Sequence, residues 1–108
     1  MINIEDVHKL EIKIGTIVSA DIVPDADKLI AYKVDIGGEI KNILSGVRQY
    51  FPDPSLLVGK QMPVIVNLEP RTIRGIESEG MILYVTGEGD NFTTLEPGKK
   101  VDSGTNVT

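Results

Sequence analysis

The sequence predicts an all-β protein whose strands close into a small five-stranded barrel. Segments rich in β-branched residues recur along the chain, and in the clearest of them apolar and polar residues alternate from Ile30 to Ile36. Alternation with a period of two is typical of half-buried strands. The Gly, Pro and Asp residues between these segments are typical of turns. This pattern predicts strands that are joined by short turns.

The first half of the chain is expected to hold a short helix and three strands. Asn3 can cap a helix over Ile4–Lys9, whose first turn contains acidic residues that the helix dipole favours. Residues 12–23 form the first strand, in which Gly15 is expected to mark a bulge or a sharp bend. The alternating strand follows, and Gly37-Gly38 makes a two-residue hairpin turn into the third strand.

The second half is expected to hold one helical turn and two further strands. Asp53, Pro54 and Ser55 can begin the turn, and Gly59 ends it. The fourth strand is QMPVIVNL and the fifth is GMILYV, and the segment between them is expected to be a loop. Because Pro63 has no amide donor, the fourth strand is expected either to be an edge there or to begin beyond it.

Five strands with a short helix between the third and the fourth is the layout of the OB-fold. This Greek-key barrel often binds nucleic acids or sugars. A chain of 108 residues has the length of one domain. Residues 1–108 are therefore expected to form one OB-fold domain with an N-terminal helix.

The composition narrows the class of protein. The chain has no cysteine, one histidine, no signal-peptide pattern and no apolar run long enough for a membrane span, so a soluble cytoplasmic protein is expected. Its net charge is −5, but residues 28–75 carry seven basic and four acidic side chains, whereas each flanking part carries two basic and six acidic ones. This distribution argues against indiscriminate nucleic-acid binding and is compatible with a specific basic site.

Motifs for catalysis or cofactor binding are missing. LSGV lacks the outer glycines of a nucleophile elbow, GEGDNF lacks the third glycine of a dinucleotide loop, and there is no Walker motif. PDADK could be a metal loop, but the further ligands of an EF-hand are absent, and a solvated turn is the preferred interpretation. A non-catalytic binding domain without metal or cofactor is expected.

Four segments together resemble one known family. They are PDADKL at 24–29, ILSGV at 43–47, VGKQMPVIVNLEPRTIRGIESEGMIL at 58–83 and FTTLEPGKKVDSGTNV at 92–107. They are similar to the tRNA-binding domain attached to many methionyl-tRNA synthetases, which also occurs as a free-standing protein and in a small secretion-related chaperone. The most specific piece is the series Asn67, Leu68, Pro70, Arg74, Gly75, Ser78, Gly80 and Met81. The resemblance implies an OB-fold that dimerises through its N-terminal segment and tail and binds tRNA by shape.

The candidate RNA contacts centre on two arginines. Arg71 and Arg74 can each present a planar fork of donors to a phosphate, and Gly75 lets the backbone come close to a ligand. Glu69 stands where relatives often have a basic or neutral residue, so the phosphate contacts fall more heavily on these arginines. The structural alternative is an ion pair between Arg74 and Glu79.

Further candidates are polar residues outside this pair. Asn67 and Ser78 offer donors suited to a 2′-hydroxyl or a phosphate oxygen, although Asn67 could merely satisfy a turn. Lys28 is a phosphate contact by family analogy. Asn42 and Ser45 are either a polar strand face or part of an RNA-facing surface. Aromatic residues are scarce, so recognition of the RNA backbone and shape is expected rather than base stacking.

Two functions remain open. In the first, the domain binds tRNA and assists a methionyl-tRNA synthetase, in cis or in trans, with a second copy of the chain as a further partner. In the second, it is a dimeric chaperone that binds unfolded peptide. Neither DNA nor a membrane is an expected partner.

Overall fold

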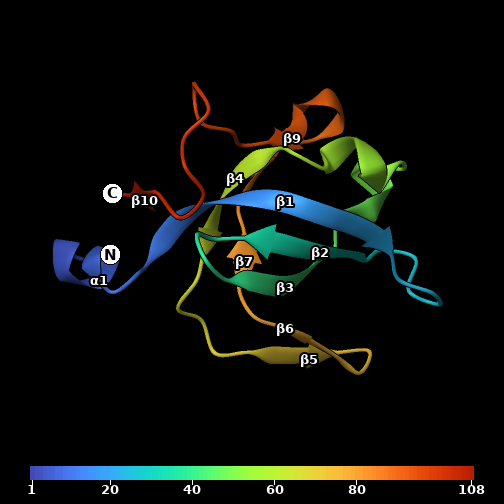
Figure 1. Cartoon of the computed structure of the whole chain (residues 1–108), viewed down its shortest axis with the longest axis horizontal. Coiled ribbons are helices and arrows are strands. Elements are labelled where there is room, and N and C mark those ends of the chain that lie inside the picture. The colour runs from blue at the N-terminus through green and yellow to red at the C-terminus, as the bar shows by residue number, and fades with distance from the viewer.

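Five antiparallel strands form the barrel in the computed structural model, which describes residues 1–108 (Figure 1). In spatial order they are β3 (Ile40–Ser45), β2 (Ile30–Asp35), β1 (Ile12–Ile22), β4 (Gln61–Ile65) and β7 (Met81–Ile82). The two outer strands approach each other, and Glu79, which lies just before β7, donates its amide hydrogen to the Asn42 carbonyl of β3 at 2.8 Å. The predicted all-β, five-stranded barrel is therefore confirmed, with its last seam nearly closed.

β1 is the longest strand because it serves both halves of the barrel. Its first part, Ile12–Thr16, pairs with β4, and its second part pairs with β2. The β-bulge lies between Ile17 and Ser19, so the prediction of a bulge at Gly15 is wrong. Gly15 instead allows close packing, because a side chain there would overlap Val34 and crowd Val64. A glycine inside a strand pattern can signal either feature.

The barrel interior is filled by apolar side chains around one pair of hydroxyls. Seven side chains are almost completely buried, namely Ile17, Ile30, Tyr32, Val34, Ile43, Met62 and Val64. The Tyr84 hydroxyl donates to the Tyr32 hydroxyl at 2.9 Å, and each hydroxyl thereby meets its hydrogen-bonding need inside the barrel. Burial raises the pKa of both tyrosines, since it disfavours the charged phenolate.

The helices are short and lie outside the barrel. The predicted N-terminal helix is confirmed as α1 (Ile4–His8), which Asn3 caps through a reciprocal pair of hydrogen bonds with Asp6. Between β3 and β4 the chain forms two 3₁₀ turns, η1 (Arg48–Tyr50) and η2 (Pro54–Leu57), rather than an α-helical turn. None of the helices has the length and apolar character needed to cross a membrane.

Two segments differ from the sequence prediction. The expected loop forms a hairpin of β5 (Arg71–Ile73) and β6 (Ile76–Ser78), and the expected fifth strand is divided into β7 and β8 (Tyr84–Thr86). After the turn η3 (Gly89–Asn91), β8 pairs with β9 (Phe92–Thr94).

Pro63 lies inside β4, although the prediction placed it at an edge or before the strand. It opposes Ile14 of β1, and its carbonyl accepts from the Leu83 amide at 3.0 Å. The nitrogen and the carbonyl of one strand residue face the same edge of the strand. The nitrogen of Pro63, which carries no hydrogen, therefore faces the β7 side of β4, at the end of the β4–β7 pairing. No ladder bond to β1 is lost.

The C-terminal tail covers a free edge of β1. β10 (Asn106–Val107) pairs with Ile12 and Lys13. The Ile14 amide donates to the Thr105 carbonyl at 2.8 Å, and its carbonyl accepts from the Gly104 amide at 2.7 Å. The tail thus extends the sheet beside the N-terminal segment, and Figure 1 places the two ends of the chain on the same side of the barrel.

Candidate nucleic-acid interface

The β5–β6 hairpin presents the two arginines to solvent. Its turn is made by Arg74 and Gly75, whose φ angles are 53° and 78°. Positive φ at both central residues defines the two-residue turns that match the twist of a hairpin. Arg71 and Arg74 are exposed, and the two ion pairs of the molecule, Lys9–Asp6 and Lys60–Glu96, lie elsewhere. The alternative of an Arg74–Glu79 ion pair is therefore wrong.

A small apolar cluster holds the hairpin and the β1–β2 loop against the same surface of the barrel. Val23 and Ala26 of the loop are buried against Leu44 of β3, and Ile73 of the hairpin packs on this group. Figure 1 shows the hairpin beneath β3, with its turn and the β1–β2 loop extending to the same side of the molecule. Lys28 is an exposed residue of this loop, and the loop packs on the same cluster as the hairpin that carries the arginines. We call this surface the loop–hairpin face.

Polar contacts connect the hairpin to β3. Ser78 is buried, and its hydroxyl oxygen accepts from the Leu44 amide at 3.0 Å. The Glu79 carboxylate accepts from the Asn42 amide at 3.0 Å and from its side-chain amide at 3.4 Å. Ser78 thus joins strands at the barrel seam, whereas Asn42 is exposed and its side chain lies at the edge of the loop–hairpin face.

Two predicted site residues lie away from this face. Ser45 shares the inward side of β3 with Ile43, because alternate residues of a strand face the same way. Burial raises the pKa of Tyr84, while hydrogen bonding with Ser45 and Tyr32 acts in the opposite direction. Asn67 accepts from the Glu11 amide at 2.9 Å and donates to the Lys9 carbonyl at 2.7 Å, so it fastens the segment after α1.

Lys33 belongs to the same surface, although the sequence prediction did not include it. It is exposed on β2 directly opposite Asn42, and both residues line a shallow hollow of about 80 Å³ together with Asp21 and Ile76. The alternation of β2 and the Gly37-Gly38 turn contained the signal. Together they fix the register and turn Lys33 outward.

Comparison with known proteins identifies the protein family. Residues 12–106 match the family described as the putative tRNA-binding domain. Since the match covers most of the chain, the protein belongs to this family.

The relatives in sequence are methionine–tRNA ligases. The ligase of Bacteroides fragilis is 42% identical over 106 residues, which cover 98% of this chain and 16% of the ligase. That of Methanospirillum hungatei is 47% identical over 106 residues, covering 98% of this chain and 15% of the ligase. The chain thus spans only a small part of the curated relatives it matches.

Solved structures of similar fold match along the whole chain. A MetRS-related protein from Pyrococcus horikoshii has a TM-score of 0.91 at 29% identity, covering 100% of this chain and 98% of that protein. The chaperone CsaA from Bacillus anthracis has a TM-score of 0.88 at 28% identity, covering 100% and 99%. The fold therefore occurs in proteins with two different descriptions.

Proposed function

We propose that this domain binds tRNA on its loop–hairpin face and so helps a methionyl-tRNA synthetase, in cis or in trans, to hold its tRNA. The observation that carries the proposal is the shared apolar cluster. It fixes Lys28, Arg71 and Arg74 on one side of an acidic molecule, without carboxylate partners for the arginines. We assign the barrel to the OB-fold class and residues 1–108 to one tRNA-binding unit.

The side chains divide into ligand contacts and positioning residues. Arg71, Arg74 and Lys28 contact phosphates, with Lys33 as an added contact, and Asn42 suits a 2′-hydroxyl. Such contacts recognise the shape of folded RNA rather than its sequence. We assign positioning roles to the other predicted residues. Ser78 holds the hairpin on β3, Ser45 faces Tyr84, and Asn67 fastens the N-terminal segment.

Fluorescence anisotropy with labelled tRNA tests this site. Arg74→Ala is expected to cost about 1–3 kcal/mol of binding free energy, the size of a lost charge-assisted hydrogen bond. If roughly three to four phosphates are contacted, the log–log salt slope is about −2.5 to −3.5. Lys9→Ala is the matched control, because it removes a charge on α1 and leaves the loop–hairpin face intact. A flat salt response, or equal losses in both variants, would exclude this site.

We further propose that the domain is a homodimer in which a second copy covers exposed apolar residues. The exposed side chains of the N-terminal segment are those of Met1, Ile2, Ile4, Val7 and Leu10. A cavity of about 360 Å³ beside the tail is lined by Ile14, Pro63, Leu95, Val101 and Val107 among others. A two-fold interface would bury both regions. Light scattering that finds a monomer at tens of micromolar would contradict the dimer.

The same apolar surfaces favour a second candidate function, the binding of unfolded peptide. The likeness to the chaperone CsaA supports this alternative. Suppression of the aggregation of an unfolded protein, without any effect on tRNA binding by a synthetase, would replace the first proposal with the second.

A further inference from the structure

Two cavities meet at Lys60, across the barrel from the loop–hairpin face. One has a volume of about 310 Å³ and lies between the 3₁₀ turns and β9, with Phe51, Leu56 and Leu57 among its lining residues. The other, of about 280 Å³, has no apolar lining residue and contains Lys60, Lys99 and Lys100. Figure 1 shows the green 3₁₀ turns and β9 on one side of β1–β3 and the hairpin on the other. An apolar cavity thus adjoins a cationic one.

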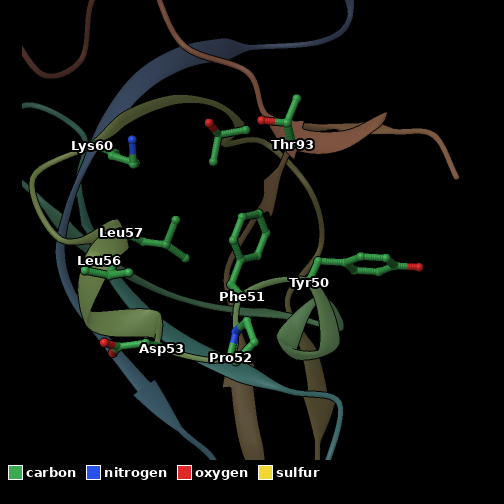
Figure 2. Close-up of a pocket in the computed structure, with 9 residues that line it drawn as sticks. Tyr50, Phe51, Pro52, Asp53, Leu56, Leu57, Lys60 and Thr93 are labelled. Atoms are coloured by element: carbon green, nitrogen blue, oxygen red, sulfur yellow. The ribbon is translucent and has the colours of Figure 1, made fainter. Parts of the chain in front are cut away.

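Aromatic rings cluster around the apolar cavity. Tyr50 stacks on Phe92 with ring centroids 3.6 Å apart, and Phe51 lies 6.0 Å from both Tyr84 and Phe92. Four of the five aromatic residues of the chain therefore gather here. Figure 2 shows Phe51 and Leu57 facing each other across the cavity, with the Tyr50 ring directed away. The scarcity of aromatic residues in the sequence hides their concentration at this place.

The cationic cavity has more positive than negative charge. The Lys60 ammonium lies 3.4 Å from the Glu96 carboxylate, which also accepts from the Thr94 hydroxyl at 2.6 Å. Lys99 and Lys100 are exposed and form no ion pair. Three lysines from two segments thus face one carboxylate, in a chain of net charge −5. An unpaired pair of ammonium groups beside a cavity favours an anionic group on the ligand.

We propose that the two cavities form a subsite for one unpaired nucleotide of a bound RNA. The base enters between Phe51 and Leu57, and its phosphate lies on Lys60, Lys99 and Lys100. Bases accept apolar and aromatic walls regardless of sequence, and the apolar cavity lies within the size range of small-ligand sites. The charges determine the orientation of the bound nucleotide, because Asp53 and Lys60 lie at different ends of the apolar cavity (Figure 2). The phosphate is expected at the end of Lys60. The subsite rests on the proposed RNA-binding function and adds a contact on a second side of the barrel.

Binding of a labelled single-stranded pentaadenylate tests the subsite apart from the loop–hairpin face. The double variant Lys99→Ala/Lys100→Ala is expected to lose about tenfold in affinity and to lower the salt slope by about 0.7, the single-strand value for one phosphate contact. Leu56→Glu is expected to weaken binding as well, because it places a like charge at the cavity. Leu56 is 73% exposed, so the fold tolerates this change. Lys9→Ala, which lies outside both proposed sites, should leave pentaadenylate binding unchanged.

The outcomes separate the two proposals. The nucleotide subsite is overturned if Lys99→Ala/Lys100→Ala leaves pentaadenylate affinity unchanged. It is also overturned if that variant lowers the affinity but Leu56→Glu does not. If the Arg71→Ala/Arg74→Ala variant still binds tRNA with full affinity, the proposed loop–hairpin face is overturned instead. In NMR titrations, adenosine monophosphate should shift the signals of Phe51 and Leu57, whereas inorganic phosphate should not. Equal shifts with both ligands would reduce the site to an anion site and contradict the proposal.

Discussion

At the scale of single residues, Arg74 combines a costly backbone conformation with a charge. Its φ of 53° lies in the left-handed region, which costs a residue with a Cβ about 1–2 kcal/mol. The next residue, Gly75, also has positive φ and bears no such cost. Turn stability alone would therefore not favour an arginine at the first position of this turn, whereas the proposed contact of its side chain with RNA would.

Arg74→Asn separates the turn from the ligand contact. Asn-Gly is a preferred pair for a turn with two positive φ angles, so the free energy of unfolding should stay the same or rise by up to about 1 kcal/mol. The affinity for tRNA should nevertheless fall about tenfold, because the guanidinium is lost. Urea denaturation and anisotropy measure the two quantities. A variant that loses stability and affinity together would indicate that Arg74 serves only the hairpin.

Substitutions of the Tyr32–Tyr84 hydroxyl pair are expected to have non-additive effects on stability. Tyr84→Phe should cost about 1–3 kcal/mol, because the buried Tyr32 hydroxyl loses its partner. Tyr32→Phe should cost less, since Tyr84 is only half-buried and keeps Ser45 nearby. The double variant should be more stable than the sum of the single losses implies. Denaturant unfolding of all three variants tests this, and simple additivity would contradict it.

The same pair predicts a loss of stability at alkaline pH. Burial raises the pKa of Tyr32 above its ordinary value of 10.0, so the folded state keeps a proton that the unfolded state releases. Stability is fully present below about pH 10 and falls as the pH rises further. Unfolding free energies measured from pH 8 to 11 should show this decline. Tyr32→Phe/Tyr84→Phe should flatten it, and an equal decline in that variant would place the cause elsewhere.

At the scale of elements, the hairpin depends on contacts that are distant in sequence. β5 and β6 have three residues each, too few to be stable as an isolated hairpin. Ile73 supplies an apolar contact to the cluster around Leu44, and Ser78 supplies a hydrogen bond to the same residue. The hairpin therefore holds its arginines in place only while it is docked on β3.

Ile73→Ala is expected to weaken tRNA binding without removing any charge. The truncation should lower the free energy of unfolding by about 1–2 kcal/mol, since the side chain is only half-buried. The loop–hairpin face should then lose its fixed geometry, and tRNA affinity should fall several-fold. Ile40→Ala is the control, because Ile40 is 50% exposed at the start of β3. Equal binding by both variants would show that docking of the hairpin is irrelevant to the ligand.

The first three strands could be predicted from the sequence because their signals are local. The alternation of β2 and the Gly37-Gly38 turn determine strand, register and connection without knowledge of the remainder. The hairpin was missed because its strands are short and its docking partner is Leu44. The contacts of Asn67 with Lys9 and Glu11 were equally out of reach, since they join residues 58 and 56 positions apart. Arg71 and Arg74 were predicted from residue chemistry and the family resemblance, whereas the packing of their hairpin and the Lys28 loop on one cluster required the structure.

At the scale of the whole molecule, the proposed function is binding without catalysis. Under the proposed function it holds tRNA equally in the ground state and the transition state of aminoacylation. Such uniform binding lowers KM without raising kcat. A second grip on the same tRNA also makes the first contact effectively intramolecular.

Removal of this domain from a methionyl-tRNA synthetase is therefore expected to raise KM for tRNA while kcat and amino-acid activation stay near normal. Steady-state aminoacylation with and without the domain, fused or added in trans, measures the effect. The Arg71→Ala/Arg74→Ala domain should behave like the deletion, and the Lys9→Ala domain should not. A change in kcat at unchanged KM would contradict the proposed role.

The tail strand β10 and the preceding turn have a consequence for how the protein is made. The edge of β1 that they cover is translated before Gly104, Thr105 and β10, which lie far behind it in the sequence. During that interval the nascent chain carries an open strand edge, the kind of surface on which polypeptides add to one another. The contact also joins segments far apart in sequence, which slows its formation. The nascent chain is therefore expected to be prone to aggregation until its tail has been synthesised.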